Sequence, residues 1–323
     1  MINRPLIQSS TNSRYLALIL VTIISSLLAL RPIGIGLDDE SYLVYFNGAK
    51  DIISRYNGLS LVFNEPLWLI ISYAAGEILG DDGSLRFVIF TSAAFAGIGL
   101  GRINRWALLP IVLYFTLPAS LKNHVDHLRQ GFALGLYLLF FSANGHWRML
   151  RFVTPLVHSS FWVVILLDVA ISRYYKRRQN PTRIDTLKIF LISVGVSVVF
   201  ASALVEVTAM LGFRQADLYG LLSSEGSSAA FIAWIVLLPV LLLLANQRTF
   251  GPFSTYLGFY LGGYFLNPVA ARIFENSYFL ICSAAPIVSR SKRLVFWMVM
   301  MAICIVLGMT GNLYPRLLGF SSP

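Results

Sequence analysis

The residues best suited to chemistry lie in one short stretch, 123–130, which reads Asn-His-Val-Asp-His-Leu-Arg-Gln. The stretch places two imidazoles, a carboxylate and a guanidinium directly before the apolar run 131–143. An arginine that opens a helix of bilayer length costs free energy unless it is paired, hydrated or bound to a ligand, so Arg129 is a candidate functional residue. The alternative is an arginine that snorkels from a helix end to the membrane surface, and the stretch alone leaves both open.

The same stretch contains a possible metal site, because His124 and His127 are three residues apart with Asp126 between them. A catalytic zinc site normally shows a stronger ligand pattern, such as HExxH, and the sequence has none. We therefore predict no metal and no other cofactor. Both histidines are interpreted as loop structure, with His127 close enough to contact a substrate.

Three carboxylates precede other predicted helices. Asp38 and Asp39 stand before 42–54, which has an amphipathic helical pattern and apolar residues available to lie along a membrane surface. Either residue is a plausible N-cap, and Asp39 is also a candidate base. Glu65 stands directly before Pro66, which is ordinary at a helix start, but a carboxylate entering an apolar span favours a base or the partner of an arginine.

Two further polar groups lie later in the chain. His158 falls inside the apolar segment 150–172, where a histidine is often a satisfied hydrogen-bond donor between helices. Arg272 lies three residues before Glu275, and a local ion pair is the simplest interpretation of that spacing.

The elements that must position these residues are membrane helices. The 323-residue chain is 57% hydrophobic and 12% charged, with a mean hydropathy of +0.71. This composition predicts an all-α polytopic membrane protein, one integral domain over 1–323 with about 10–12 membrane helices, some of them broken or re-entrant. The apolar segments are 15–31, 61–79, 86–101, 106–118, 129–144, 150–172, 187–209, 229–246, 252–268, 272–288 and 294–310.

The charges sort the loops into two kinds. Basic loops hold 16 of the 25 Lys and Arg residues, and acidic or mixed loops include 31–55, 81–82, 124–129, 214–225 and 272–275. The positive-inside rule places the basic loops in the cytoplasm and the others outside. The net charge of +10 is then explained by anionic membrane lipid, and no nucleic-acid motif is present.

Two segments do not fit this alternation, because 61–79 and 150–172 would each begin and end on the same side. Pro155 and His158 lie near the middle of 150–172, which favours two half-helices that enter and leave from the cytoplasm. Asn64-Glu65-Pro66 opens 61–79, which is a second candidate for re-entrance. Irregular backbone at membrane depth survives only where protein buries it or where it lines a wet cavity, although a misassigned loop explains the mismatch equally well.

Taken together, these motifs resemble the EpsG-like group of O-antigen and exopolysaccharide polymerases, the Wzy type. The resemblance covers roughly 30–165 and rests on Arg31 before Gly-x-Gly-x-Asp-Asp-x-x-Tyr, on Glu65-Pro66, on Arg129-Gln130 and on His158-Ser159. It implies a fold like that of the membrane-embedded glycosyltransferase C superfamily. It also implies a multi-pass protein of the bacterial inner membrane with its active site facing the periplasm.

The activity implied by the resemblance is polymerisation of lipid-linked repeat units. The growing glycan passes from undecaprenyl diphosphate to the non-reducing end of a newly arrived undecaprenyl-diphosphate-linked oligosaccharide, and a chain-length regulator is an optional further partner. A diphosphate leaving group needs fixed positive charge, and we expect it from Arg129, Arg272 and Arg31, in that order.

The other roles follow from the same chemistry. The acceptor hydroxyl needs a general base, for which the order of candidates is Glu65, Asp39 and His158. Substrate contacts are assigned to Tyr42, Gln130 and His127, and the aromatic residues Tyr45, Trp68 and Tyr73 are further candidates for stacking on sugars. The rival interpretations are a transporter or flippase of lipid-linked oligosaccharides, and an O-antigen ligase or acyltransferase.

Overall fold

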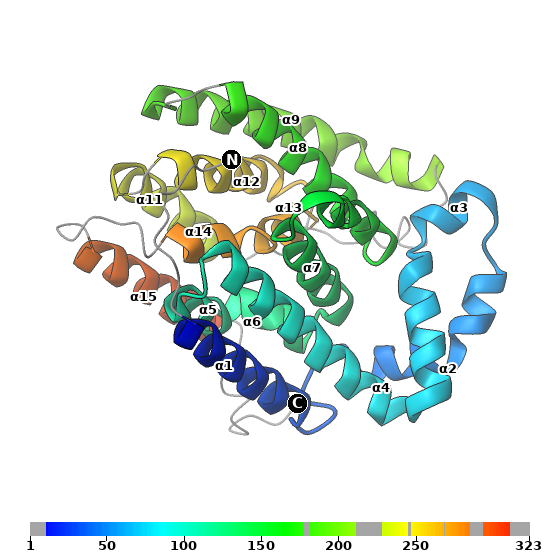
Figure 1. Ribbon diagram of the computed structural model, residues 1–323. Helices are drawn as coiled ribbons and strands as arrows, with labels where there is room; N and C mark the ends of the chain where they lie inside the picture. The colour runs from blue at the N-terminus through cyan, green and yellow to red at the C-terminus, as the bar shows by residue number, and fades with distance from the viewer. Residues whose placement is uncertain are drawn as a thin grey trace. The chain divides into compact units, whose positions relative to one another are not determined.

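The computed structural model describes residues 11–177, 181–210, 228–244, 247–267, 269–284 and 293–310, and every regular element within them is a helix (Figure 1). Gln8–Phe161 make up most of one compact unit, and Trp162–Leu307 make up most of a second. The described helices of the N-terminal unit are α1 (Thr11–Ala29), α2 (Asp39–Ser54), α3 (Gly58–Phe63), α4 (Pro66–Ile103), α5 (Leu108–Thr116), α6 (Pro118–Val125), α7 (Leu128–Phe141) and the 3-10 helix η1 (Gly145–Leu156).

The second unit follows from Trp162, one residue into α8. Its described helices are α8 (Phe161–Arg177), α9 (Arg183–Met210), α11 (Ser228–Leu244), α12 (Gln247–Gly263), α13 (Val269–Glu275), α14 (Tyr278–Ala284) and α15 (Arg293–Thr310).

The predicted all-α class is confirmed, and the apolar helices are those of a membrane protein. Among the described residues, three helices are long and apolar enough to cross a bilayer: Thr11–Ala29, Pro66–Ile103 and Arg183–Leu204. The apolar helix Leu128–Phe141 is shorter. The larger number of 10–12 membrane helices, and the likeness to glycosyltransferase C enzymes, stay predictions.

The longest helix, α4, contains residues from two segments that were expected to be separate. Residues 66–79 form its first piece and 86–101 lie in its second, and the two pieces meet at a kink at Gly80, whose φ of 66° and ψ of 179° suit glycine alone. The expected division between the segments is therefore present as this kink, but Asp81 and Asp82 lie in the helix that follows it rather than in a loop. The helix survives the bend because Ser84 Oγ donates to Gly80 O at 2.6 Å, and Asn47 of α2 holds Asp81 through a 2.8 Å hydrogen bond.

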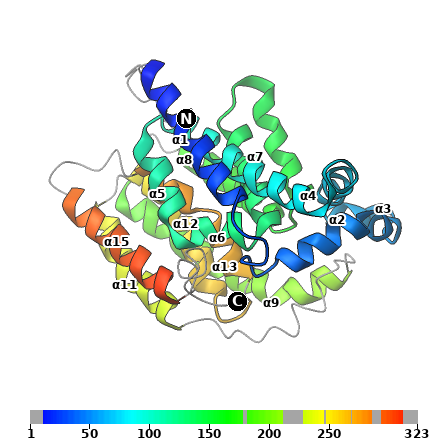
Figure 2. The same ribbon diagram turned by 90° about the horizontal axis from the view of Figure 1, so that it is seen from below.

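Helix α4 is the centre of the N-terminal unit, with α1, α2 and α7 packed against it. Both views show α2 and α3 beside the first half of α4 (Figures 1 and 2). The helices approach closely at glycines: a Cβ on Gly135 would lie 2.6 Å from Ser92 O, and one on Gly97 would lie 2.6 Å from the Val21 side chain. Small residues at such crossings are typical of helix packing in membranes.

The second predicted break, in 150–172, is confirmed as a break in the backbone. The helix η1 ends at Leu156, one residue after Pro155, and α8 begins at Phe161. His158 therefore lies in the four-residue connection between two helices rather than within one. The corresponding break in 61–79 lies at Asn64 and Glu65, between α3 and α4.

In the C-terminal unit, α9 and α12 form the most extensive helix pair. Ser193 Oγ donates to Thr255 O at 2.7 Å, and a Cβ on Gly258 would lie 2.6 Å from Phe190 O. The glycines of α12 therefore serve helix packing, as expected from the sequence, and no phosphate-binding loop is formed there.

Candidate active site

The carboxylate of Glu65 joins three parts of the N-terminal unit. Its Oε1 accepts hydrogen bonds from His158 Nδ1 at 2.7 Å and from the backbone N–H of Ser159 at 3.1 Å, and its Oε2 accepts one from Arg129 Nη1 at 2.6 Å. We call Glu65, Arg129, His158 and Ser159 the Glu65 cluster. Glu65 is 2% exposed, so an ionised carboxylate there depends on these donors.

The backbone at Glu65 is strained. Its φ of 63° and ψ of 51° place a non-glycine residue in the left-handed region, which costs about 1–2 kcal/mol. Pro66 begins α4, and the Glu65 side chain makes no capping hydrogen bond to that helix. Of the two interpretations of Glu65-Pro66, the carboxylate is thus an arginine partner rather than an N-cap. Strain of this kind persists where the surrounding structure fixes it, commonly at functional sites.

Arg129 stands in the first turn of α7, as the sequence indicated. Its guanidinium carbon lies 5.1 Å from the ring centroid of Tyr45, and its backbone N–H donates to the hydroxyl of Tyr42 at 3.2 Å. Among the described residues its Nε has no hydrogen-bond partner, and 16% of the side chain is exposed. The guanidinium is therefore positioned by Glu65 and two tyrosines without having all its donors used.

The position of His158 follows from its neighbours in the chain. Its backbone N–H bonds to Thr154 O at 3.1 Å and its carbonyl accepts from the Phe161 N–H at 3.0 Å, so the residue is fixed between η1 and α8. The ring is buried against Glu65. When Nδ1 carries the proton and donates it to that carboxylate, Nε2 is the basic nitrogen of the ring. Histidine bases that are oriented by a carboxylate have the same arrangement.

Ser159 is the member of the cluster that the sequence did not single out. Its backbone N–H and its hydroxyl, at 3.3 Å, both donate to Glu65 Oε1. The only indication in the sequence is its place directly after His158.

An aromatic group supports the cluster from α2 and α4. The rings of Tyr42 and Trp68 meet edge to face with centroids 5.8 Å apart, and Trp68 meets Phe132 of α7 at 6.3 Å. Tyr42, Phe46 and Trp68 are buried, which corrects the expectation that the apolar face of 42–54 lies on a membrane surface. Burial raises the pKa of the Tyr42 phenol, so the hydroxyl stays protonated.

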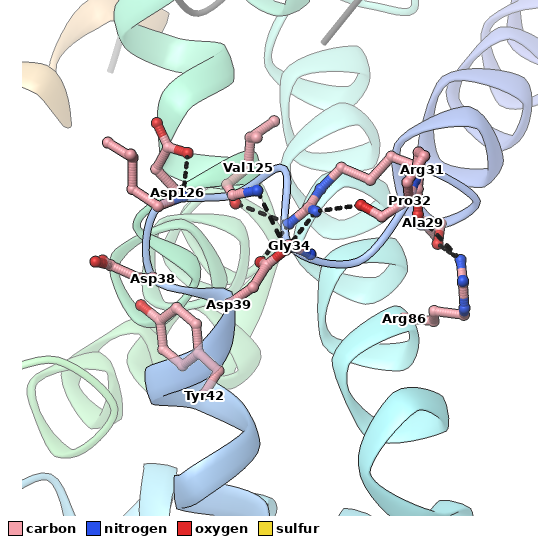
Figure 3. Close-up of polar contacts among 12 residues, drawn as sticks. Ala29, Arg31, Pro32, Gly34, Asp38, Asp39, Tyr42, Arg86, Val125 and Asp126 are labelled. Carbon is pink, nitrogen blue, oxygen red and sulfur yellow. Dashed lines mark hydrogen bonds and ion pairs between the residues drawn. The ribbon is translucent and has the colours of Figure 1, made fainter. Parts of the chain in front are cut away.

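A second arginine–carboxylate pair lies in the loop between α1 and α2 (Figure 3). Arg31 and Asp39 form two hydrogen bonds of 2.6 Å each, and Arg31 also donates to Pro32 O at 3.1 Å and to Val125 O at 3.0 Å. Asp39 Oδ2 accepts from the backbone N–H of Gly34 at 2.9 Å and of Gly36 at 3.1 Å. We call this group the Arg31 cluster.

The Arg31 cluster gives two predicted site residues a structural explanation. Asp39 is the first residue of α2 and 1% exposed, with both oxygens bonded, and Asp38 at the N-cap position makes no capping bond. Arg31 is 7% exposed. Both oxygens of Asp39 and both terminal nitrogens of Arg31 are used in these hydrogen bonds, so we assign both side chains to holding the loop against Val125.

The histidines of the opening stretch do not form a metal site. His124 Nδ1 bonds to Ser92 Oγ at 2.6 Å and Nε2 to Tyr114 OH at 2.9 Å, so both ring nitrogens are used. Burial lowers its pKa to about 3, which keeps the ring neutral. Asp126 accepts from Leu37 N at 3.1 Å, and the described residues contain no group of three potential metal ligands.

The remaining predicted residues lie in three different settings. His127 Nδ1 is 3.3 Å from Asp38 Oδ2, where it ties the turn before α7 to the loop before α2. Gln130 is buried in the first turn of α7. Arg272 lies with Glu275 in α13 of the C-terminal unit, and Glu275 Oε2 has no hydrogen-bond partner among the described residues.

The structure thus brings together Glu65, Arg129 and His158, with Tyr42 beside them. The comparisons with known proteins add no name to this site. No family model, no curated protein and no solved structure matches the chain.

Proposed function

We propose that this chain is a membrane glycosyltransferase that polymerises oligosaccharide units carried on undecaprenyl diphosphate. The observation that carries the proposal is the Glu65 carboxylate, which holds an arginine and a histidine from distant parts of the sequence. A fixed cation beside an oriented base is what glycosyl transfer from a lipid diphosphate requires.

In this mechanism His158 replaces Glu65 as the general base. The acceptor sugar's hydroxyl gives its proton to Nε2 of His158 while its oxygen attacks the anomeric carbon of the donor. The bond between that carbon and the diphosphate oxygen breaks, and undecaprenyl diphosphate leaves with the electron pair. Glu65 holds the imidazole through Nδ1 and stabilises it when protonated.

Arg129 meets the leaving group in this proposal. Its bond to Glu65 uses Nη1 and its Nε is buried, so a phosphate oxygen would meet the part of the guanidinium that stays exposed. A planar guanidinium suits this role because it presents several fixed donors to an oxyanion. Tyr45 lies against the other side of the same guanidinium and is a candidate to contact the first sugar. Arg272 lies in the C-terminal unit, and its role as a diphosphate ligand stays a prediction from the sequence.

The decisive experiment uses the purified full-length protein in detergent with undecaprenyl-diphosphate-linked oligosaccharide and no membrane gradient. A ladder of longer glycans on a gel supports the proposal, whereas unchanged substrate contradicts it and leaves the flippase interpretation. An O-antigen ligase would use the same groups but would transfer glycan only when a lipid A core acceptor is added. Activity in the presence of EDTA is expected, because no metal takes part in the proposed steps.

Matched variants test the residues. We expect His158→Gln and Arg129→Gln to lower the rate by about 100-fold or more, the usual cost of removing a general base or an oxyanion donor. His146→Gln, on an exposed histidine of η1, and Arg55→Gln, on the exposed end of α2, should leave it unchanged. Normal ladders from the first pair would overturn the assigned roles, and Arg272→Gln reports separately on the C-terminal unit.

A further inference from the structure

A cavity of about 760 Å³ lies in the N-terminal unit, away from the Glu65 cluster. Its walls include Arg14 near the start of α1, Arg102 in the last turn of α4, and the residues that end α7. Trp106, Asn144 and Trp147 complete most of the lining. Glu65 directly precedes α4 and Arg129 lies in the first turn of α7, so the cavity lies at the opposite ends of the helices that build the candidate active site.

The length of α1 locates the cavity with respect to a bilayer. Helix α1 has 19 residues and is about 28 Å long, close to the thickness of the hydrocarbon core of a membrane. Arg14 lies in its first turn and Arg31 just beyond its end, and the apolar stretch between them is about 24 Å long. The cavity therefore lies where the apolar parts of the helices end, on the face that the basic loops predict to be cytoplasmic.

The charge of the cavity is positive and not balanced within it. No carboxylate is among the lining residues, and Arg14 and Arg102 form no ion pair with any described residue. The Arg14 guanidinium lies 5.5 Å from the ring centroid of Trp106. An arginine in the first turn of a helix is unfavourable for the helix dipole, so α1 itself gives no reason for Arg14 to be there.

The rim of the cavity has the composition of a membrane surface. Trp147, which lines the cavity, is 57% exposed. Its neighbours in η1 include Met149, 62% exposed, and Arg148 and Arg151, whose guanidinium groups lie over the ring of Phe141. Exposed tryptophan beside arginine is characteristic of the headgroup region, where one side of a residue is wet and the other apolar.

We propose that this cavity binds the headgroup of an anionic phospholipid, with the phosphate between Arg14 and Arg102 and the ester region against Trp106 and Trp147. Basic pockets between membrane helices recognise such headgroups by charge and by the apolar surface around them. The inference is independent of the proposed activity, since it concerns the other end of the unit and uses none of the Glu65 cluster.

The test measures binding of phosphatidylglycerol and of phosphatidylcholine to the full-length protein by native mass spectrometry, with affinity from titration. We expect phosphatidylglycerol to bind preferentially, and Arg14→Gln with Arg102→Gln to weaken it roughly 30-fold while phosphatidylcholine is unaffected. Lys50→Gln with Arg55→Gln removes the same charge from exposed positions in and directly after α2. This variant should bind both lipids with the affinity of the wild type. Equal binding of the two lipids, or unchanged binding to the Arg14 and Arg102 variant, would overturn the proposal.

A second pair of measurements separates the lipid from free phosphate and from misfolding. Inorganic phosphate and glycerol phosphate at millimolar concentration should not displace phosphatidylglycerol, and displacement by either would assign the cavity to a soluble phosphate compound instead. Gly101→Ala alters the cavity without changing charge, because the new Cβ would lie 2.7 Å from the Trp106 ring. We expect it to weaken phosphatidylglycerol several-fold, and wild-type affinity in this variant would exclude Trp106 from the site.

Discussion

The two arginine–carboxylate pairs of the N-terminal unit differ in how completely each arginine is used. Arg31 makes two bonds to Asp39 and two more to backbone carbonyls, with 5% of its side chain exposed. Arg129 makes one bond to Glu65, and 16% of its side chain is exposed. The comparison separates a pair that holds a loop from a pair that can still accept a ligand, although the sequence made all four residues candidates for the site.

The largest effect should follow from breaking the Arg31–Asp39 pair. Asp39→Ala leaves the Arg31 guanidinium buried without its counter-ion, and we expect the free energy of unfolding to fall by about 3–5 kcal/mol. Thermal and denaturant unfolding of the purified protein measure this. Asp51→Ala, on an exposed position of the same helix, should change stability by less than about 0.5 kcal/mol. Similar stability for both variants would show that the Arg31 cluster is not structural.

Replacing each arginine by lysine should then show that the Arg129–Glu65 pair affects glycan synthesis and that the Arg31–Asp39 pair affects stability. Arg129→Lys keeps a charge beside Glu65 but loses the planar set of donors, so we expect glycan synthesis to fall about 100-fold with little change in stability. Arg31→Lys should do the reverse. We expect its free energy of unfolding to fall by about 2–3 kcal/mol, and the folded protein to synthesise glycan at a near-normal rate. The contrast fails if both variants change the same property.

Two glycine-to-alanine substitutions in the α1–α2 region test the Arg31–Asp39 pair through smaller changes in stability. A Cβ on Gly36 would lie 2.5 Å from Asp39 Oδ1 and 2.6 Å from Val125 O, so Gly36→Ala should cost about 1–3 kcal/mol of unfolding free energy. Gly48 lies inside α2 with open space around it, and Gly48→Ala should instead raise the free energy of unfolding by about 0.5–1 kcal/mol. Changes of the same sign in the two variants would contradict the packing described for Gly36.

The smallest expected effect concerns the support of Arg129. Tyr42→Phe removes the hydroxyl that accepts a hydrogen bond from the backbone N–H of Arg129. We expect the free energy of unfolding to fall by about 1 kcal/mol and glycan synthesis to slow a few-fold. Tyr15→Phe, on a tyrosine of α1 that is 60% exposed, is the matched control and should behave as wild type. An undiminished rate in Tyr42→Phe would remove the tyrosine from the site.

The sequence predicted the class of fold and the core of the site for separate physical reasons. Apolar runs of bilayer length indicate membrane helices without knowledge of any contact. Glu65, Arg129 and His158 were recognisable because each is polar at the edge of an apolar segment, where it needs a partner. The sequence did not show that they are one another's partners.

Other features depend on long-range contacts and left no local pattern. Asp39 was an equally good helix cap or base by position, and only the approach of Arg31 and of two backbone N–H groups assigns it to the loop. The order of bases changed because the Glu65 oxygens accept hydrogen bonds from Arg129, His158 and Ser159. The helical conformation of Asp81 and Asp82 could not be predicted from their charge, since helices tolerate carboxylates that a neighbour such as Asn47 holds.

The bend at Gly80 also bears on how often the chain is expected to cross the bilayer. A straight α4 of 38 residues would be about 57 Å long, nearly twice the hydrocarbon thickness of roughly 30 Å. Bent at Gly80, it has a first piece of about 21 Å and a second of about 35 Å, and only the second is long enough to cross. We therefore expect one crossing in α4, by the piece that follows Gly80, and a first piece that begins and ends on one side, as the loop charges predict for 61–79. With that count, the loops from α1 to α4 would alternate between the two aqueous compartments without an additional span.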